Sequence, residues 1–141
     1  MQPPLAPQCF VDAARYLALL EELATAARQL DPPVDSVVGI KRSGLFPAVV
    51  LSHRLKLPFF TATEAKYFPY PRLAWPLVID TVAWTGETIR RCQHRLERSG
   101  VPLDRLRVLT MFARLDPPPP VPHLTWLETS ARIPEFWYAA D

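Results

Sequence analysis

The sequence predicts an α/β domain in which helices flank a mostly parallel, twisted sheet. Short continuous apolar runs alternate along the chain with segments of helical periodicity, and strands buried on both faces are typical of parallel sheets covered by helices. The chain has 141 residues, of which 49% are hydrophobic and 21% charged, which suits one domain with a substantial core. We therefore expect a single domain over 1–141, with an extended arm over 1–9 and a Pro-rich segment over 116–141.

Each element is predicted from its own pattern. Apolar residues from Phe10 to Leu30 recur at helical spacing, and Pro32 and Pro33 stop that helix. Residues 63–75 carry aromatics and prolines without a period and are expected to form a loop. The other expected elements are helices over 45–55 and 85–99, the second ending at Gly100, and strands over 34–40, 57–61, 76–80 and 106–112.

Charge and cysteine content exclude several classes of protein. The net charge is +2, from 16 basic and 14 acidic residues, which argues against nucleic acid or an anionic membrane as partner. The apolar runs are too short to span a membrane and the N-terminus does not look like a signal peptide, so we expect a cytoplasmic protein. Cys9 and Cys92 suggest no disulfide framework, and His53, His94 and His123 lack metal-ligand spacing.

The few glycines indicate where a ligand would bind. Only four are present, and Gly39, Gly44 and Gly86 lie at or just after the ends of predicted strands. In open α/β sheets, ligands bind beyond the carboxyl ends of the strands. The sequence therefore predicts a binding site at that edge.

The turn Thr85-Gly86-Glu87-Thr88 follows a strand and opens a helix. Backbone N–H groups and the helix dipole make such a turn suited to phosphate. Asp80, at the strand tip, suits sugar hydroxyls or a hydrated divalent cation. The pattern equally allows a plain helix start with Thr85 as N-cap. It matches neither a Walker loop nor the three-glycine dinucleotide pattern.

A second loop, Lys41-Arg42-Ser43-Gly44, repeats this arrangement between a strand and a helix. Two anion-suited loops on one sheet edge imply a ligand with two separated phosphate groups. The alternative is that Lys41 and Arg42 are only solvated charges.

These stretches resemble the type I phosphoribosyltransferases. "PLVIDTVAWTGET" is similar to that family's signature for phosphoribosyl pyrophosphate, and "GIKRSGLFPA" to its pyrophosphate loop. "VLTMFARL" and "RIPEFWYAAD" resemble the xanthine/guanine subgroup's base-binding strand and its small C-terminal hood. The resemblance runs from about Val34 to Tyr138.

The resemblance implies a role for each matching position. Asp80 and Arg42 would be catalytic, with Asp80 contacting the ribose hydroxyls and the shell of a Mg²⁺ cofactor, and the partners would be phosphoribosyl pyrophosphate and a nucleobase or nucleoside monophosphate. The resemblance also implies three groups of contacts. The 5′-phosphate would be bound by Trp84, Thr85, Gly86, Glu87 and Thr88, and the pyrophosphate by Lys41, Arg42, Ser43 and Gly44. A purine-type base would be bound by Arg114, Ile133, Phe136 and Trp137. For the aromatic residues, a core role is an open alternative. The family also implies a homodimer.

Two positions depart from the family pattern. Thr81 replaces the second acid of the signature, and Trp84 stands where purine members place an aspartate that acts as general base. An indole cannot accept that proton. Two main functions therefore remain open: phosphoribosyl transfer to a nucleobase, and nucleotide binding without catalysis. A third, weaker alternative is an unrelated small phosphate-binding domain.

Overall fold

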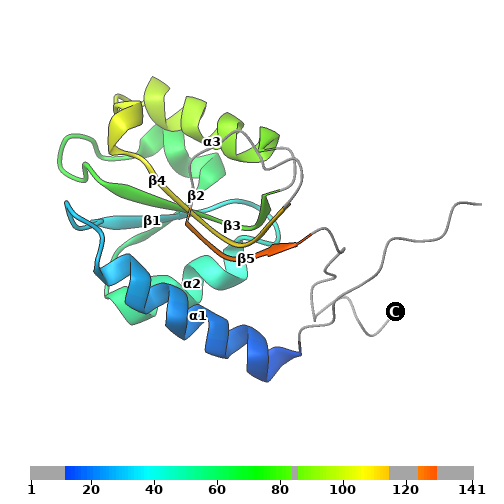
Figure 1. The fold of residues 1–141 in the computed structure, drawn as a ribbon. Coiled ribbons are helices and arrows are strands. Elements are labelled where there is room, and N and C mark those ends of the chain that lie inside the picture. The colour runs from blue at the N-terminus through cyan, green and yellow to red at the C-terminus, as the bar shows by residue number, and fades with distance from the viewer. Residues whose placement is uncertain (1–11, 84–85, 115–123, 130–141) are drawn as a thin grey trace, which may run out of the picture.

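A computed structural model of the chain describes residues 12–83, 86–114 and 124–129. The helices are α1 (Ala13–Arg28), α2 (Leu45–Leu55) and α3 (Glu87–Arg98), with short 3-10 helices η1 (Ala62–Tyr67) and η2 (Leu103–Arg105). The strands β1 (Ser36–Gly39), β2 (Phe59–Thr61), β3 (Pro76–Ala83), β4 (Arg107–Arg114) and β5 (Leu124–Thr129) form one parallel sheet in the order β2-β1-β3-β4-β5 (Figure 1). The predicted α/β architecture is confirmed, with β5 as an additional strand.

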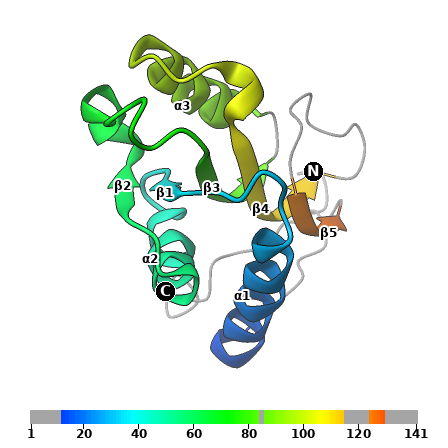
Figure 2. The same cartoon turned by 90° about the vertical axis from the view of Figure 1, so that its left-hand side faces the viewer.

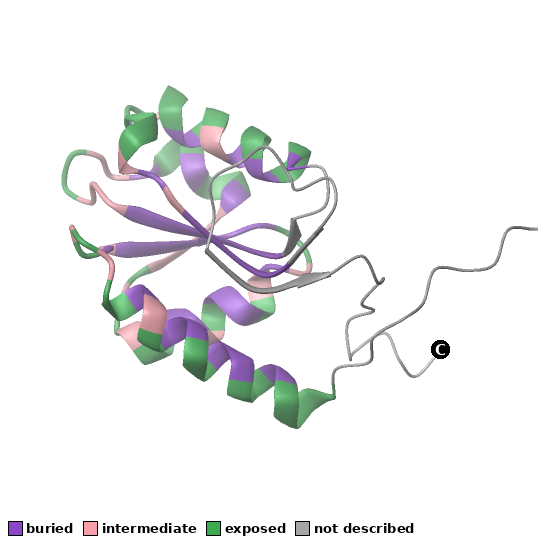
Figure 3. Ribbon diagram, in the orientation of Figure 1, coloured by how far each residue is buried: buried purple, intermediate pink, exposed green. Residues whose placement is uncertain are grey.

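Helices cover both faces of the sheet. α1 and α2 lie on one face and α3 on the other (Figure 2). Successive residues of β3 point to opposite faces: Leu77 and Ile79 join the core under α1 and α2, and Val78 joins the core under α3. β1 and residues 76–81 of β3 are accordingly buried throughout (Figure 3). This two-sided burial explains why they appear in the sequence as continuous apolar runs.

Helix α1 is shorter than predicted and presents a different face to the core. It begins after Asp12, whose side chain accepts a hydrogen bond of 2.8 Å from the backbone N–H of Arg15. Tyr16 is buried, whereas Leu17, expected in the core, is 45% exposed. The reason is that Tyr16, with its larger apolar surface, sets the face that Leu20 and Leu23 continue. No helix of the described ranges is long and apolar enough to cross a membrane.

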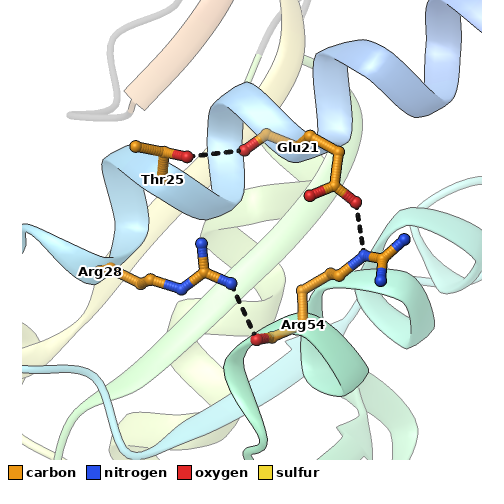
Figure 4. Close-up of polar contacts among 4 residues, drawn as sticks. All are labelled: Glu21, Thr25, Arg28 and Arg54. Atoms are coloured by element: carbon orange, nitrogen blue, oxygen red, sulfur yellow. Dashed lines mark hydrogen bonds and ion pairs between the residues drawn. The ribbon is translucent and has the colours of Figure 1, made fainter.

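Polar contacts join α1 to α2 at their exposed edge (Figure 4). The carboxylate of Glu21 pairs with the guanidinium of Arg54, and Arg28 donates a hydrogen bond of 3.0 Å to the backbone carbonyl of Arg54. Both partners of the ion pair are about half exposed, so the pair contributes little to stability. These contacts align two helices whose apolar faces supply most of the interaction.

The segment expected to be a loop over 63–75 contains most of η1, which packs against α3. Ala62, Ala65 and Phe68 are buried in the core on the α3 face. The expected loop is therefore partly helical, and its first half is fixed to the domain. This half of the segment is therefore not a free loop that could close over the carboxyl ends of the strands.

Candidate functional site

The order of the strands places β1 and β3 side by side. From β1 the chain passes through α2 to β2 on one side, whereas β3 continues through α3 to β4 on the other. β1 and β3 are direct neighbours, with Gly39 opposite Ile79. Strand order reverses at this point, which is where open α/β sheets form their ligand-binding crevice. The loop after β1 and the segment from β3 into α3 thus belong to the same edge of the sheet.

The loop after β1 is pressed onto the end of β3. The Gly44 N–H donates to the carbonyl of Ile40 at 3.0 Å, which closes the loop. A Cβ atom on Gly44 would lie 2.6 Å from the carbonyl oxygens of Ile40 and Ile79 and 3.1 Å from the Cα of Asp80. Only glycine fits this contact. Gly44 therefore sets the distance between the loop and Asp80, which lies within the second half of β3.

The same loop offers several groups to an anion. Lys41 and Arg42 are exposed, and the peptide between them is cis. Within the described residues, the N–H groups of Lys41, Arg42 and Ser43 make no backbone hydrogen bond. Helix α2 follows at once, and no side chain caps its N-terminus at Gly44. Two cations, three amide donors and a helix dipole thus lie within a few residues.

Asp80 is the buried acid of the site. Its side chain is only 7% exposed and accepts hydrogen bonds from the N–H of Thr81, at 2.8 Å, and from the side chain of Ser43. Burial raises the pKa of the Asp80 carboxyl to about 6, because the two hydrogen bonds offset only part of the desolvation. The carboxylate is ionised at neutral pH and lies where a cation or sugar hydroxyl would stabilise it.

Thr81, in the position of the family's second acid, has a structural role. It is 1% exposed, and its hydroxyl donates a hydrogen bond of 2.9 Å to the backbone carbonyl of Ser43. Ser43 in turn contacts Asp80. Thr81 therefore ties the loop after β1 to the end of β3.

Thr110 is a site residue that the sequence analysis missed. It lies on β4 directly opposite Asp80, and its buried hydroxyl has no hydrogen-bond partner among the described residues. A buried polar atom of this kind calls for a partner such as water or a ligand hydroxyl. The available signal was a threonine inside an apolar strand, but its pairing with Asp80 depends on a register that the sequence does not reveal.

Helix α3 begins later than predicted. Its N-cap is Gly86, in the left-handed conformation with φ of 80°, and no side chain caps it. The N-cap position is thus held by Gly86 rather than by Thr85, which lies outside the described residues, and a glycine has no side chain that could cap the first turn of α3. The Glu87 carboxylate lies 3.5 Å from the Arg91 guanidinium, so we expect Glu87 to bind phosphate through its backbone.

One cleft joins the two loops. A space of about 140 Å³ is lined by Lys41, from the loop after β1, and by Thr88, from the first turn of α3. Arg91 and Arg95 of α3 line it as well. The structure thus brings together residues that the sequence assigned separately to pyrophosphate and to the 5′-phosphate.

Several predicted site residues lie outside the described part of the chain. They are Trp84, Thr85, Ile133, Phe136 and Trp137, together with Cys9. Arg114 is the last residue of β4, opposite Thr129 of β5, but its side chain is not described. The assignments to base and 5′-phosphate at these positions stay predictions.

Cys92 is buried, and burial raises the pKa of its thiol to about 12, which keeps it protonated and unreactive.

Asp80 is the described residue best placed to hold a divalent cation. The described residues contain no cluster of three or more His, Cys, Asp or Glu side chains. Mg²⁺ in phosphate-transferring sites is commonly held by one or two carboxylates together with substrate phosphates and water. Asp80, buried and facing the loop that carries Lys41 and Arg42, fits that kind of site.

No family model and no curated protein matches the chain. Solved structures do. The xanthine-guanine-hypoxanthine phosphoribosyltransferase of Helicobacter pylori aligns with a TM-score of 0.79 at 16% identity, covering 92% of each chain. A purine phosphoribosyltransferase from Pyrococcus horikoshii aligns with a TM-score of 0.72 at 19% identity, covering 90% of this chain and 91% of that one.

A hypothetical protein from Neisseria gonorrhoeae with bound ppGpp aligns with a TM-score of 0.78 at 16% identity, covering 99% of this chain and 93% of that one. Together these likenesses show that the chain has the type I phosphoribosyltransferase fold, as its resemblance to the purine-type subgroup predicted.

Proposed function

We propose that the chain binds phosphoribosyl pyrophosphate and transfers its phosphoribosyl group to a nucleobase, releasing pyrophosphate. The observation that carries this proposal is the meeting of two anion-suited loops at the β1/β3 switch point, with the buried carboxylate of Asp80 against the loop after β1. The donor carries a 5′-phosphate and a pyrophosphate on one ribose. Its two anionic ends match the two loops.

In the proposed reaction, a ring nitrogen of the base forms a bond to the anomeric carbon while the bond from that carbon to pyrophosphate oxygen breaks. Positive charge develops on the sugar and negative charge on the leaving group. Lys41 and Arg42, with the free amides beside them, would offset the charge of the departing pyrophosphate. Thr88 and the N-terminus of α3, with its helix dipole, would hold the 5′-phosphate and so fix the sugar between base and leaving group.

Asp80 would hold the ribose hydroxyls and the hydrated Mg²⁺ that accompanies pyrophosphate. The bound Mg²⁺ supplies charge neutralisation on the pyrophosphate oxygens. A cation next to a carboxylate favours its ionised form, so ligand binding would lower the pKa of Asp80 from about 6. Purine-type acceptors are the proposed bases, on the resemblance of Arg114 and the C-terminal hood, and a cytoplasmic homodimer is the proposed form.

A nucleotide-binding role without catalysis is the second candidate. Two observations favour it. The hydroxyl of Thr81 donates to the backbone carbonyl of Ser43, and Asp80 carries the only buried carboxylate among the described residues. The Neisseria protein of similar structure has ppGpp bound. Such a protein would use the same loops to bind a nucleotide.

Mass spectrometry distinguishes the two candidates. The protein is incubated with Mg²⁺, phosphoribosyl pyrophosphate and each nucleobase in turn, and the products are analysed for a nucleoside monophosphate. Transfer predicts one or a few product masses that disappear in the Lys41→Ala/Arg42→Ala variant. A matched control, Lys56→Gly/Arg72→Ala, removes two exposed charges elsewhere, and Gly suits the left-handed backbone at Lys56. Nucleotide binding without any product would support the second candidate.

A further inference from the structure

A basic groove runs along α3 away from the proposed transfer site. A cleft of about 370 Å³ lies between η1 and the second half of α3, lined by Thr63, Lys66, Arg95, Arg98 and Ser99. It shares Thr63 and Arg95 with the smaller cleft beside Lys41. At 1.5 Å per residue, Ser99 lies about 16 Å along the helix from Thr88. The groove therefore reaches well beyond the loops of the transfer site.

The charge in this groove is of one sign. Lys41, Lys66, Arg91, Arg95 and Arg98 line the two connected clefts, and no acidic residue lines either of them. Among the described residues, neither Arg95 nor Arg98 forms an ion pair. Arg91, which lines the smaller cleft, and Arg90, which lines neither cleft, instead lie 3.5 and 4.0 Å from the carboxylate of Glu87.

Nothing in the fold requires this concentration of charge. Arg95 and Arg98 are exposed on the side of α3 that borders η1, and each is one turn or less from the next cation of the groove, so they repel one another. The core under α3 is formed by other residues, Ile89, Cys92 and Leu96. Like charges held together in a concave space are stabilised when an anion occupies it.

We propose that this groove is a second binding site, for a small linear polyphosphate anion. The larger cleft has the volume of a small-molecule site. Lys66, Arg95 and Arg98 would bind the phosphate chain, with the guanidinium groups as bidentate donors. Thr63 lines both clefts, and its hydroxyl would donate to the same chain.

This second site is distinct from the proposed transfer site, and its proposal does not rest on the proposed transfer function. A concave groove with cations along one wall fits a compact anion better than a long nucleic acid strand, because the chain as a whole has a net charge of only +2. Its connection to the cleft of Lys41 and Thr88 places the bound anion next to the pyrophosphate loop, where its charge would weaken the binding of a second polyanion.

The test uses inorganic tripolyphosphate as probe, with calorimetry at about 0.15 M salt, where exposed charges are well screened. Three proteins are compared, and all carry Lys41→Ala/Arg42→Ala, which removes the two cations of the pyrophosphate loop. The first carries only this background, the second adds Arg95→Gln/Arg98→Gln, and the third adds Arg72→Gln/Arg90→Gln. The last two have lost the same charge. A short single-stranded RNA is titrated into each in parallel.

We expect tripolyphosphate to bind the background protein, to bind at least tenfold more weakly after Arg95→Gln/Arg98→Gln, and to be unaffected by Arg72→Gln/Arg90→Gln. The proposal is overturned by an absence of binding to the background protein or by equal losses in the two charge-matched variants. It is also overturned if the RNA binds more tightly than tripolyphosphate and depends on the same two arginines, which would make the groove a nucleic acid surface. Binding of phosphoribosyl pyrophosphate to the wild type is measured separately, so failure of one proposal is distinguishable from failure of the other.

Discussion

Replacing Asp80 with asparagine is predicted to stabilise the free protein while removing its ligand affinity. The folded state holds this carboxyl at a pKa of about 6, against 3.8 for an unperturbed group. The folded protein therefore binds the proton more tightly than the unfolded chain does. Stability falls as pH rises from about 4 to about 6, and stays constant above that range. At pH 7.5 the ionised, buried carboxylate lowers the free energy of unfolding by at most about 3 kcal/mol.

Asp80→Asn removes this penalty because its amide oxygen can still accept the N–H of Thr81. We expect an increase in unfolding free energy of about 1–3 kcal/mol at pH 7.5, or about 3–10 °C in Tm for a chain of this size. At pH 4.5, where the folded carboxyl is mostly protonated, the gain should be smaller by about 2 kcal/mol. Chemical denaturation at the two pH values measures both numbers.

Asp35 provides a matched control, because its replacement by asparagine should lower the free energy of unfolding instead of raising it. Its two carboxylate oxygens accept the backbone N–H groups of Ala74 and Trp75, at 2.6 and 3.0 Å. An amide at this position has one acceptor oxygen, so Asp35→Asn should lose about 1 kcal/mol at both pH values. If Asp80→Asn lowers stability as Asp35→Asn does, or if its effect is the same at pH 4.5 and 7.5, the account of Asp80 as a destabilised functional acid is refuted.

Two further predictions concern the loops. Gly44→Ala places a Cβ atom 2.6 Å from two carbonyl oxygens, so it should cost about 1–3 kcal/mol of stability and weaken phosphoribosyl pyrophosphate binding; a Tm and an affinity equal to those of the wild type would contradict the tight contact between loop and β3. Trp84→Asp should raise turnover of guanine, xanthine or hypoxanthine by up to about 10²-fold, because it restores a general base. Thr81→Asp should only destabilise the protein, because it loses the hydrogen bond to Ser43 and buries a second carboxylate beside Asp80. Steady-state rates and melting curves check this pair, and a rate gain from Thr81→Asp without loss of stability would count against the structural role of Thr81.

Local pattern was enough to predict most of the fold. Helix α2 was expected over the residues that form it, 45–55. In the structure the left-handed conformation of Lys56 ends it. The strands β1, β2, β3 and β4 were found from their apolar runs. The loops after β1 and β3 were placed on one edge because parallel strands share the direction of their carboxyl ends.

What could not be predicted depends on pairing between distant residues. β3 runs three residues past Asp80 because Val82 and Ala83 pair with β4. β5 lies in a region that its prolines marked as extended connection, and its pairing with β4 makes it a strand. Within the site, the bond from Thr81 to the carbonyl of Ser43 and the position of Thr110 opposite Asp80 are likewise products of tertiary structure.

The central claim is that the loops after β1 and β3 form one site for phosphoribosyl pyrophosphate. The most direct measurement is the Kd of phosphoribosyl pyrophosphate with Mg²⁺, determined by calorimetry for the wild type, for Lys41→Ala/Arg42→Ala and for Lys56→Gly/Arg72→Ala. The account predicts one ligand per chain, at least a tenfold loss of affinity in the loop variant, equal to about 1.4 kcal/mol, and no change in the control, with Tm nearly constant in all three. Equal affinities in the loop variant and the control, with both proteins folded, would contradict it.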